Sequence, residues 1–160
     1  MRKHRNGQAL VEFALVTLLL FGLLFAIIDL GIMFYVNLTM QHAVREGTRY
    51  AVTGQIGTSA NRRAALIQKI RDSSVGLYDK NLHVPKDPAI KVINPSNVTF
   101  PNYTSGTVQQ GNPGNPNDII VVSLTYSWPL VTPILKRFFL NGQYTFTVKS
   151  TMKNESFPTN

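Results

Sequence analysis

Residues 9–28 read ALVEFALVTLLLFGLLFAII and decide the fold of this chain, because Glu12 is the single charged side chain among them. At about 1.5 Å rise per residue, a helix of this length spans about 30 Å, which is the thickness of the hydrocarbon core of a bilayer. A secretory signal has a shorter apolar core and ends at a small-residue cleavage site. The residues that follow, 29–35, offer no such site. The stretch therefore predicts a retained transmembrane helix.

The charges around this helix set its expected orientation. Basic side chains precede it at Arg2, Lys3 and Arg5, and local basic residues keep the adjoining end of a span in the cytoplasm. We therefore expect a single-pass membrane protein with a cytoplasmic N-terminus and an extracytoplasmic C-terminal domain.

The whole chain carries 16 Lys and Arg against 8 Asp and Glu, a formal net charge of +8. Beyond the N-terminus this excess is spread out, and the cluster at residues 61–63 has no aromatic stacking platform beside it. We do not expect nucleic acid as a partner. An acidic surface polymer stays open as a partner.

Glu12 is the unusual residue of the apolar run. A charge at the centre of a spanning helix costs on the order of 2.5–3.5 kcal/mol, less near an end, so it usually marks function. Glu12 follows Gly7 by five residues and precedes Phe13. Either Glu12 needs a cationic partner in the membrane, or it lies among headgroups, where the helix dipole favours an acid near the N-terminus.

These residues carry a family resemblance. A basic leader ending in Gly7, Glu12 five residues later, Phe13 and an apolar helix together resemble the class III signal of type IV pilin-like proteins. Residues 41–51, QHAVREGTRYA, resemble the segment after the membrane helix in TadE-like proteins, which are minor pilin-like components of the Tad (Flp) pilus system. The resemblance is close over about residues 5–53.

The resemblance implies a prepilin peptidase that cuts between Gly7 and Gln8, and it implies subunit registration by Glu12 with Phe13. It also implies that the partners are the membrane, other pilin-like subunits and Tad assembly proteins. The residues suggest how registration would work. Cleavage exposes the ammonium of Gln8, and Glu12 of a sister molecule is a carboxylate at comparable depth, where weak screening strengthens an ion pair.

Apolar and small residues continue past the run at three- and four-residue steps, which predicts one helix from about Gln8 to Val52. Asp29 would lie near the outer membrane boundary, as an interfacial residue or as a partner for a neighbour's basic group. Three further residues are candidates for packing or interface contacts: Arg45, Glu46 and Arg49. Glu46 and Arg49 are spaced to pair on one helix face.

The remaining residues predict an α+β fold in which one helix packs on an antiparallel sheet, as in pilins. The expected divisions are a leader at 1–7, the transmembrane and stalk helix at 8–53 and the domain at 54–160. Ser59 or Asn61 would cap a second helix that buries Ala65, Leu66 and Ile70 and exposes basic residues, Arg62 among them. Strands are expected at 89–93, 97–100, 119–128 and 143–153, with prolines confining the first two to an edge and 103–118 forming an exposed loop. The chain has no cysteine, so packing alone must hold this domain.

The connection at 129–142, PLVTPILKRFFLNG, is too apolar for an ordinary surface loop. It either covers an open edge of the core, or it contacts a partner subunit or the outer leaflet with its two basic residues at the headgroups. We favour an interface role for Leu135, Phe138 and Phe139.

No residues suggest catalysis. His4, His42 and His83 lie far apart with no carboxylate or thiol at ligand spacing, so we expect no enzyme activity, no metal and no cofactor. The favoured function is a prepilin-like minor pilin or pseudopilin in Tad pilus assembly that supports adhesion or biofilm formation. The alternative is an uncleaved membrane-anchored binding module.

Overall fold

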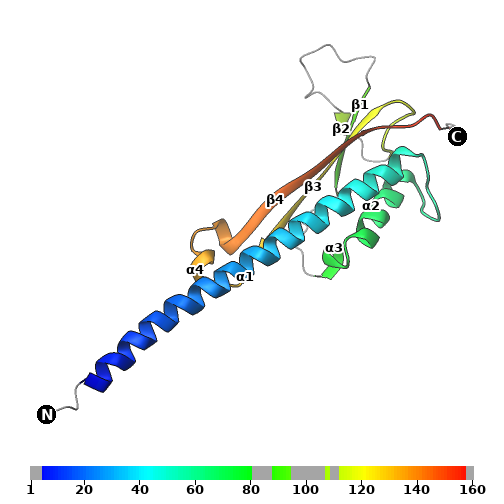
Figure 1. The fold of residues 1–160 in the computed structure, drawn as a ribbon. Helices are drawn as coiled ribbons and strands as arrows, with labels where there is room; N and C mark the ends of the chain where they lie inside the picture. Colours follow the sequence, from blue (N-terminus) through cyan, green and yellow to red (C-terminus); the bar gives the residue numbers. More distant parts are fainter. Residues whose placement is uncertain (1–4, 81–87, 95–106, 109–111, 158–160) are drawn as a thin grey trace. The chain divides into compact units, whose positions relative to one another are not determined.

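The structure, a computed structural model, describes residues 5–80, 88–94, 107–108 and 112–157. It has the expected α+β architecture, with a long N-terminal helix followed by a second helix and an antiparallel sheet (Figure 1). The helices are α1 (Arg5–Val52), α2 (Arg62–Ser73), α3 (Leu77–Lys80) and α4 (Pro133–Lys136), with a 3-10 turn at Leu140–Gly142. The strands are β1 (Ala89–Ile93), β2 (Thr107–Val108), β3 (Ile119–Pro129) and β4 (Gln143–Lys153). The expected strand at 97–100, as well as His4 and His83, lies outside the described residues.

The chain divides into two compact units. The first unit joins residues 1–35 to residues 128–144, and the second joins residues 36–127 to residues 145–160. Helix α1 and strands β3 and β4 therefore each contribute residues to both units.

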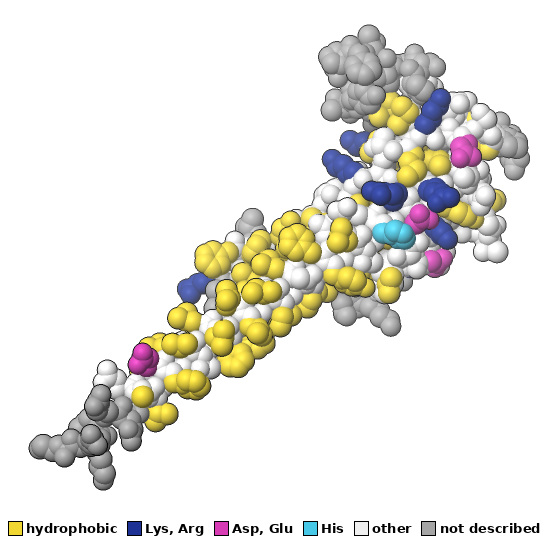
Figure 2. All heavy atoms as spheres, viewed as in Figure 1, with side chains coloured by type: hydrophobic (Ala, Val, Ile, Leu, Met, Phe, Trp, Pro, Cys, Tyr) yellow, Lys and Arg dark blue, Asp and Glu magenta, His cyan; other side chains and the backbone are white. Residues whose placement is uncertain are grey.

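The prediction of a continuous helix past the apolar run is confirmed, since α1 is one helix of 48 residues. It begins at Arg5, three positions before the expected start. Within the first unit its large apolar side chains other than Met33 are exposed, and Figure 2 shows those on the viewed face as a nearly continuous yellow surface. Among the described residues, α1 is long and apolar enough to cross a membrane, and none of its most apolar window is buried.

In the second unit, α1 changes from an exposed apolar helix to an amphipathic one. Its buried side chains recur at three- and four-residue steps, as on the core face of a helix: Val36, Met40, Ala43, Val44, Thr48 and Ala51. Gly47 lies on the same face, where a Cβ atom would collide with Ile70 Cγ1 of α2 and lie 3.1 Å from the Leu66 carbonyl oxygen. The two helices can pack this closely because residue 47 has no side chain.

Helix α2 begins as the sequence predicts. The side chain of Asn61 caps it by accepting a hydrogen bond from the Ala64 amide at 2.8 Å, so Asn61 rather than Ser59 is the cap. The predicted apolar stripe of Ala65, Leu66 and Ile70 is buried. The prediction that Arg62 faces outward is wrong, because Arg62 is 7% exposed.

The sheet has the strand order β2-β1-β3-β4. Strand β1 runs antiparallel to both β2 and β3, with Ile90 opposite Val122. Strand β1 is therefore an inner strand and not an edge strand as predicted, because the prolines near it flank the strand and leave its ladder intact. The predicted loop at 103–118 is also partly wrong, since Thr107–Val108 form β2 and Pro113, Gly114 and Asp118 are buried.

One face of β3 packs inward, and the other carries hydroxyl groups. The buried side chains alternate along the strand: Ile120, Val122, Leu124 and Tyr126. On the outer face, Thr125 contacts Thr147 and Ser127 contacts Thr145, each through hydroxyl oxygens 2.7 Å apart. Because the residue number rises on β3 as it falls on β4, these pairs show that the two strands are antiparallel, as predicted.

Candidate functional site

The predicted processing site lies in the first turns of α1. Gly7 and Gln8 are both exposed, and no atom lies within 4 Å of the place where a Cβ atom of Gly7 would be. Glu12 is exposed on the same helix, and Phe13 next to it is 70% exposed. Among the described residues, no cationic group forms an ion pair with Glu12. The Glu12 carboxylate therefore lies in the apolar run with no countercharge from the described residues.

Asp29 ends the apolar run and is 3% exposed. Its Oδ2 atom accepts hydrogen bonds from two consecutive backbone amides, those of Val131 at 3.0 Å and Thr132 at 2.9 Å. The Thr132 hydroxyl in turn donates to the Phe25 carbonyl oxygen of α1 at 3.3 Å. The apolar connection is thus fastened to the last turn of the run, and a carboxylate that accepts two N–H groups recovers part of its lost hydration.

A cavity of about 330 Å³ lies beside this contact. Apolar side chains of Phe25, Ile28 and Ile32 on α1 line it together with Val131 and Pro133 of the connection. The second carboxylate oxygen, Asp29 Oδ1, is buried and accepts no hydrogen bond from the part of the chain that the structure describes. Sequence reasoning placed Asp29 at a boundary but missed this contact, because no periodicity links residues 102 positions apart.

The predicted interface residues of the connection differ in exposure. Phe138 is 80% exposed, whereas Leu135 and Phe139 are half-buried, and Phe139 packs edge-on against Tyr144 with ring centroids 5.9 Å apart. Lys136 between them is exposed. Of the three predicted residues, Phe138 is thus the one that presents a large apolar surface.

The three interface candidates of the stalk lie in the second unit. Arg45 and Arg49 are exposed, and Glu46 is partly exposed. Arg49 and Glu46 form the predicted pair at 3.9 Å. The arginine side chain is 75% exposed, so solvent screens the pair and it contributes little to stability.

Arg62 is a structural residue that sequence reasoning missed. Its guanidinium donates to the Ala51 carbonyl oxygen at 2.7 Å, near the end of α1, and to the Gly114 carbonyl oxygen at 2.6 Å. Its Cζ lies 4.3 Å from the centre of the Phe157 ring. Burial lowers the pKa of Arg62 below its usual value, yet the guanidinium keeps its charge near neutral pH. Its position after a cap was the available signal, but nothing in the sequence specified that Arg62, rather than Arg63, turns inward.

Within the described residues, no group of three or more His, Asp or Glu side chains is arranged to hold a metal ion.

A spanning-length helix that continues into an α+β domain is consistent with a single-pass membrane protein. The family model described as TadE-like protein matches residues 7–49, which contain Gly7, Glu12, Asp29 and Arg49. This match confirms the resemblance over that segment and associates it with the Tad pilus; residues 50–160 lie outside it. No curated protein and no solved structure matches the chain.

Proposed function

We propose that this protein is a prepilin-like minor pilin or pseudopilin that acts in assembly of a Tad pilus and supports adhesion or biofilm formation. The observation that carries the proposal is the TadE-like match over residues 7–49. The match begins at the proposed cleavage glycine and includes a carboxylate that has no countercharge among the described residues. Structural assembly requires no catalytic group.

In this proposal residues 1–7 are a cytoplasmic leader, residues 8–53 anchor and register the subunit, and residues 54–160 form the extracytoplasmic domain. A prepilin peptidase cuts after Gly7. The bond lies in the first turns of α1, where the leading N–H groups have no partners within the helix, so local unwinding costs little. The freed ammonium of Gln8 then pairs with Glu12 of a sister molecule, with Phe13 packing beside it.

The mass of the membrane-extracted protein tests the processing step. In cells that contain the peptidase, the chain should begin at Gln8, and Gly7→Val should keep the leader. Gly31→Ala is the matched control, because a Cβ atom at Gly31 also meets no atom within 4 Å on the same helix. An intact leader in the native host would refute processing.

Glu12→Gln tests registration separately. The variant should be cleaved and inserted normally but should lose pili, because a neutral amide cannot neutralise the Gln8 ammonium in a weakly screened site. Glu155→Gln, an exposed carboxylate outside the apolar run and outside the family match, is the control and should leave pili intact. Normal piliation of Glu12→Gln would remove the registration role while leaving the processing step standing.

An uncleaved membrane anchor is the second candidate. One observation favours it, namely that α1 begins at Arg5 and continues unbroken through Gly7 and Gln8. The same mass measurement separates the two candidates, because the anchor keeps its leader in the native host.

A further inference from the structure

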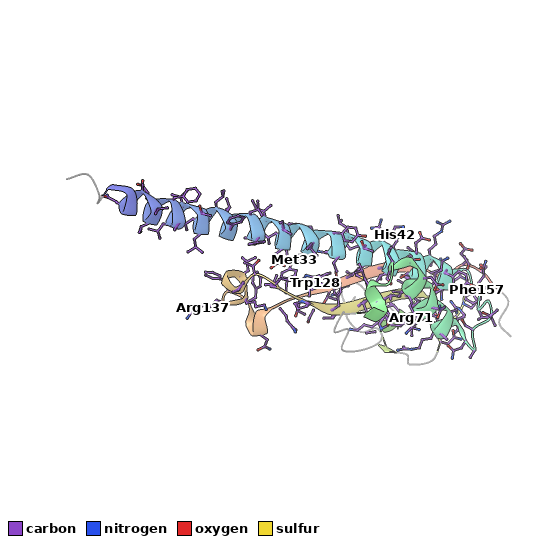
Figure 3. The ribbon with its side chains drawn as sticks, turned by 90° about the horizontal axis from the view of Figure 1, so that it is seen from below. Met33, His42, Arg71, Trp128, Arg137 and Phe157 are labelled. Atoms are coloured by element: carbon purple, nitrogen blue, oxygen red, sulfur yellow. The ribbon has the colours of Figure 1, made fainter. Side chains whose placement is uncertain are left out.

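The segment from Leu130 to Gly142, here called the boundary loop, has an unusual surface for a connection between two strands. Val131 is 75% exposed and Phe138 is 80% exposed, and Lys136 and Arg137 beside them are exposed as well. In Figure 3, Arg137 lies on the outer side of this loop, away from α1. The loop therefore presents apolar side chains and positive charges on one short stretch of chain.

The contact with α1 fixes the height of this loop along the spanning helix. Thr132 bonds to Phe25 and Asp29, which lie in the last turn of the apolar run and directly after it. Asp29 is twenty positions after Ala9, so it lies about 30 Å along the helix axis from the start of the run. That distance matches the thickness of the hydrocarbon core. The boundary loop is therefore held where acyl chains give way to headgroups.

The backbone of the loop is suited to that depth. Irregular chain beside hydrocarbon is tolerated only when its polar groups are satisfied within the protein. The amides of Val131 and Thr132 donate to Asp29, and others pair within the loop, where Leu130 donates to Gly142 and Gly142 donates to Phe139. Lys136 donates to Thr132, which starts the turn of α4.

Aromatic residues in the first unit agree with this position. Tryptophan and tyrosine concentrate at membrane interfaces because one end of each ring is apolar and the other polar. Tyr144 follows the boundary loop and is half-buried, and Tyr35 on α1 is 58% exposed. Trp128 precedes the loop, but its indole Nε1 is buried and has no hydrogen-bond partner among the described residues, so the two tyrosines carry this agreement.

We propose that the boundary loop is a second membrane contact of this protein. Phe138 and Val131 enter the edge of the acyl region, and Lys136 and Arg137 bind the phosphates of anionic phospholipids. Asp29 is the positioning residue, since it holds the loop at this depth. The proposal depends on α1 spanning a membrane and is independent of cleavage after Gly7.

Two features favour lipid over a sister copy of the chain as the occupant. Val131 lines a pocket together with Phe25, Ile28 and Ile32 of α1, so the exposed apolar surface adjoins the stretch that the proposal places in lipid. The loop also places two positive charges beside its apolar residues, and two such loops facing each other would repel. An anionic headgroup layer instead attracts them, and each basic side chain raises the membrane partition coefficient by about fivefold.

The absence of cysteine from the chain makes a direct test simple, because an introduced thiol is unique. Full-length Phe138→Cys is labelled with an environment-sensitive fluorophore and reconstituted, at low protein density, in vesicles of phosphatidylcholine with phosphatidylglycerol. Ser156→Cys is the control, since it is near-isosteric and exposed in the second unit. The label at 138 should be quenched by lipids spin-labelled near the headgroup and protected from aqueous iodide, and the label at 156 should behave oppositely.

A charge variant tests the headgroup contact. Lys136→Gln with Arg137→Gln alters two exposed side chains and should lower the quenching at 138 several-fold in anionic vesicles, to the level found in phosphatidylcholine alone. Two results would overturn the proposal. One is iodide access at position 138 equal to that at 156. The other is protection that appears only at high protein density, together with disulfide-linked dimers in a parallel sample of unlabelled Phe138→Cys, which would identify a sister copy as the occupant.

Discussion

The replacement of Asp29 by alanine should release the boundary loop from α1. In the folded protein, Asp29 Oδ2 accepts the amides of Val131 at 3.0 Å and Thr132 at 2.9 Å. A hydrogen bond to a charged group contributes about 1.5–3 kcal/mol, but burying the carboxylate offsets part of that gain. We expect Asp29→Ala to cost about 2–4 kcal/mol of docking free energy. At about 1.4 kcal/mol per tenfold, the opening constant of the loop rises by roughly 30- to 1,000-fold.

Hydrogen–deuterium exchange of the full chain in detergent micelles measures this opening. The amides of residues 131 and 132 should lose protection by that factor in Asp29→Ala. Asp29→Asn is the matched control, because its amide oxygen can accept both N–H groups through bonds about half as strong, with less charge to desolvate. The exchange protection of residues 131 and 132 in Asp29→Asn should lie between that of the alanine variant and that of the wild type.

Unchanged exchange of the Val131 and Thr132 amides in Asp29→Ala would refute this role of Asp29. An equal loss of protection throughout the second unit would also count against it, since that result would mean general unfolding. Thr132→Val provides an independent check. It removes the hydroxyl bond to Phe25 and keeps the backbone amide, so it should open the loop by less than the alanine variant does.

Two further substitutions test the packing of the second unit by thermal unfolding in detergent. Gly47→Ala should lower the free energy of unfolding by about 1–3 kcal/mol, because the new methyl group collides with Ile70; an unchanged melting temperature would show that the helices can separate freely. Arg62→Gln should cost about 1–3 kcal/mol by leaving the buried Ala51 carbonyl oxygen without its charged donor, whereas Arg63→Gln should be nearly neutral. Burial lowers the pKa of Arg62, so its protonation can change stability only at strongly alkaline pH, where the unfolded state binds more protons and stability rises with pH. The difference between wild type and Arg62→Gln should therefore be constant from about pH 5 to 9, and a slope in that window would contradict the assignment.

The strands and helices followed from the sequence where one face of an element repeats regularly. Strand β4 has the predicted bounds, and β3 extends one residue beyond its predicted end, because alternating residues mark a half-buried strand without reference to any neighbour. The short strand β2 was missed, since two residues carry no period. Nearby prolines had predicted β1 as an edge strand, whereas β2 pairs with its outer side and makes it an inner strand.

Some residues of the candidate site could likewise be predicted from the sequence, and others could not. Gly7, Glu12 and Phe13 could be singled out from the sequence because their meaning lies in spacing along one helix and in a charge among apolar residues. The inward turn of Arg62 could not be predicted, because Arg62 and Arg63 have the same chemistry. What distinguishes them is the carbonyl oxygens of Ala51 and Gly114, which only the folded chain brings together.

The sequence by itself determined that a helix of bilayer length leads the chain and where its one early charge lies, since hydrophobicity and helical rise are properties of consecutive residues. Tertiary structure alone decided that Asp29 receives the amides of Val131 and Thr132 and so holds the boundary loop at the end of the span. The physical reason is that nearly every residue carries the same backbone amide, so the residue type does not specify which acceptor that amide will bind. Its partner is chosen by the geometry that brings distant segments together and by the cost of leaving either group unpaired away from water.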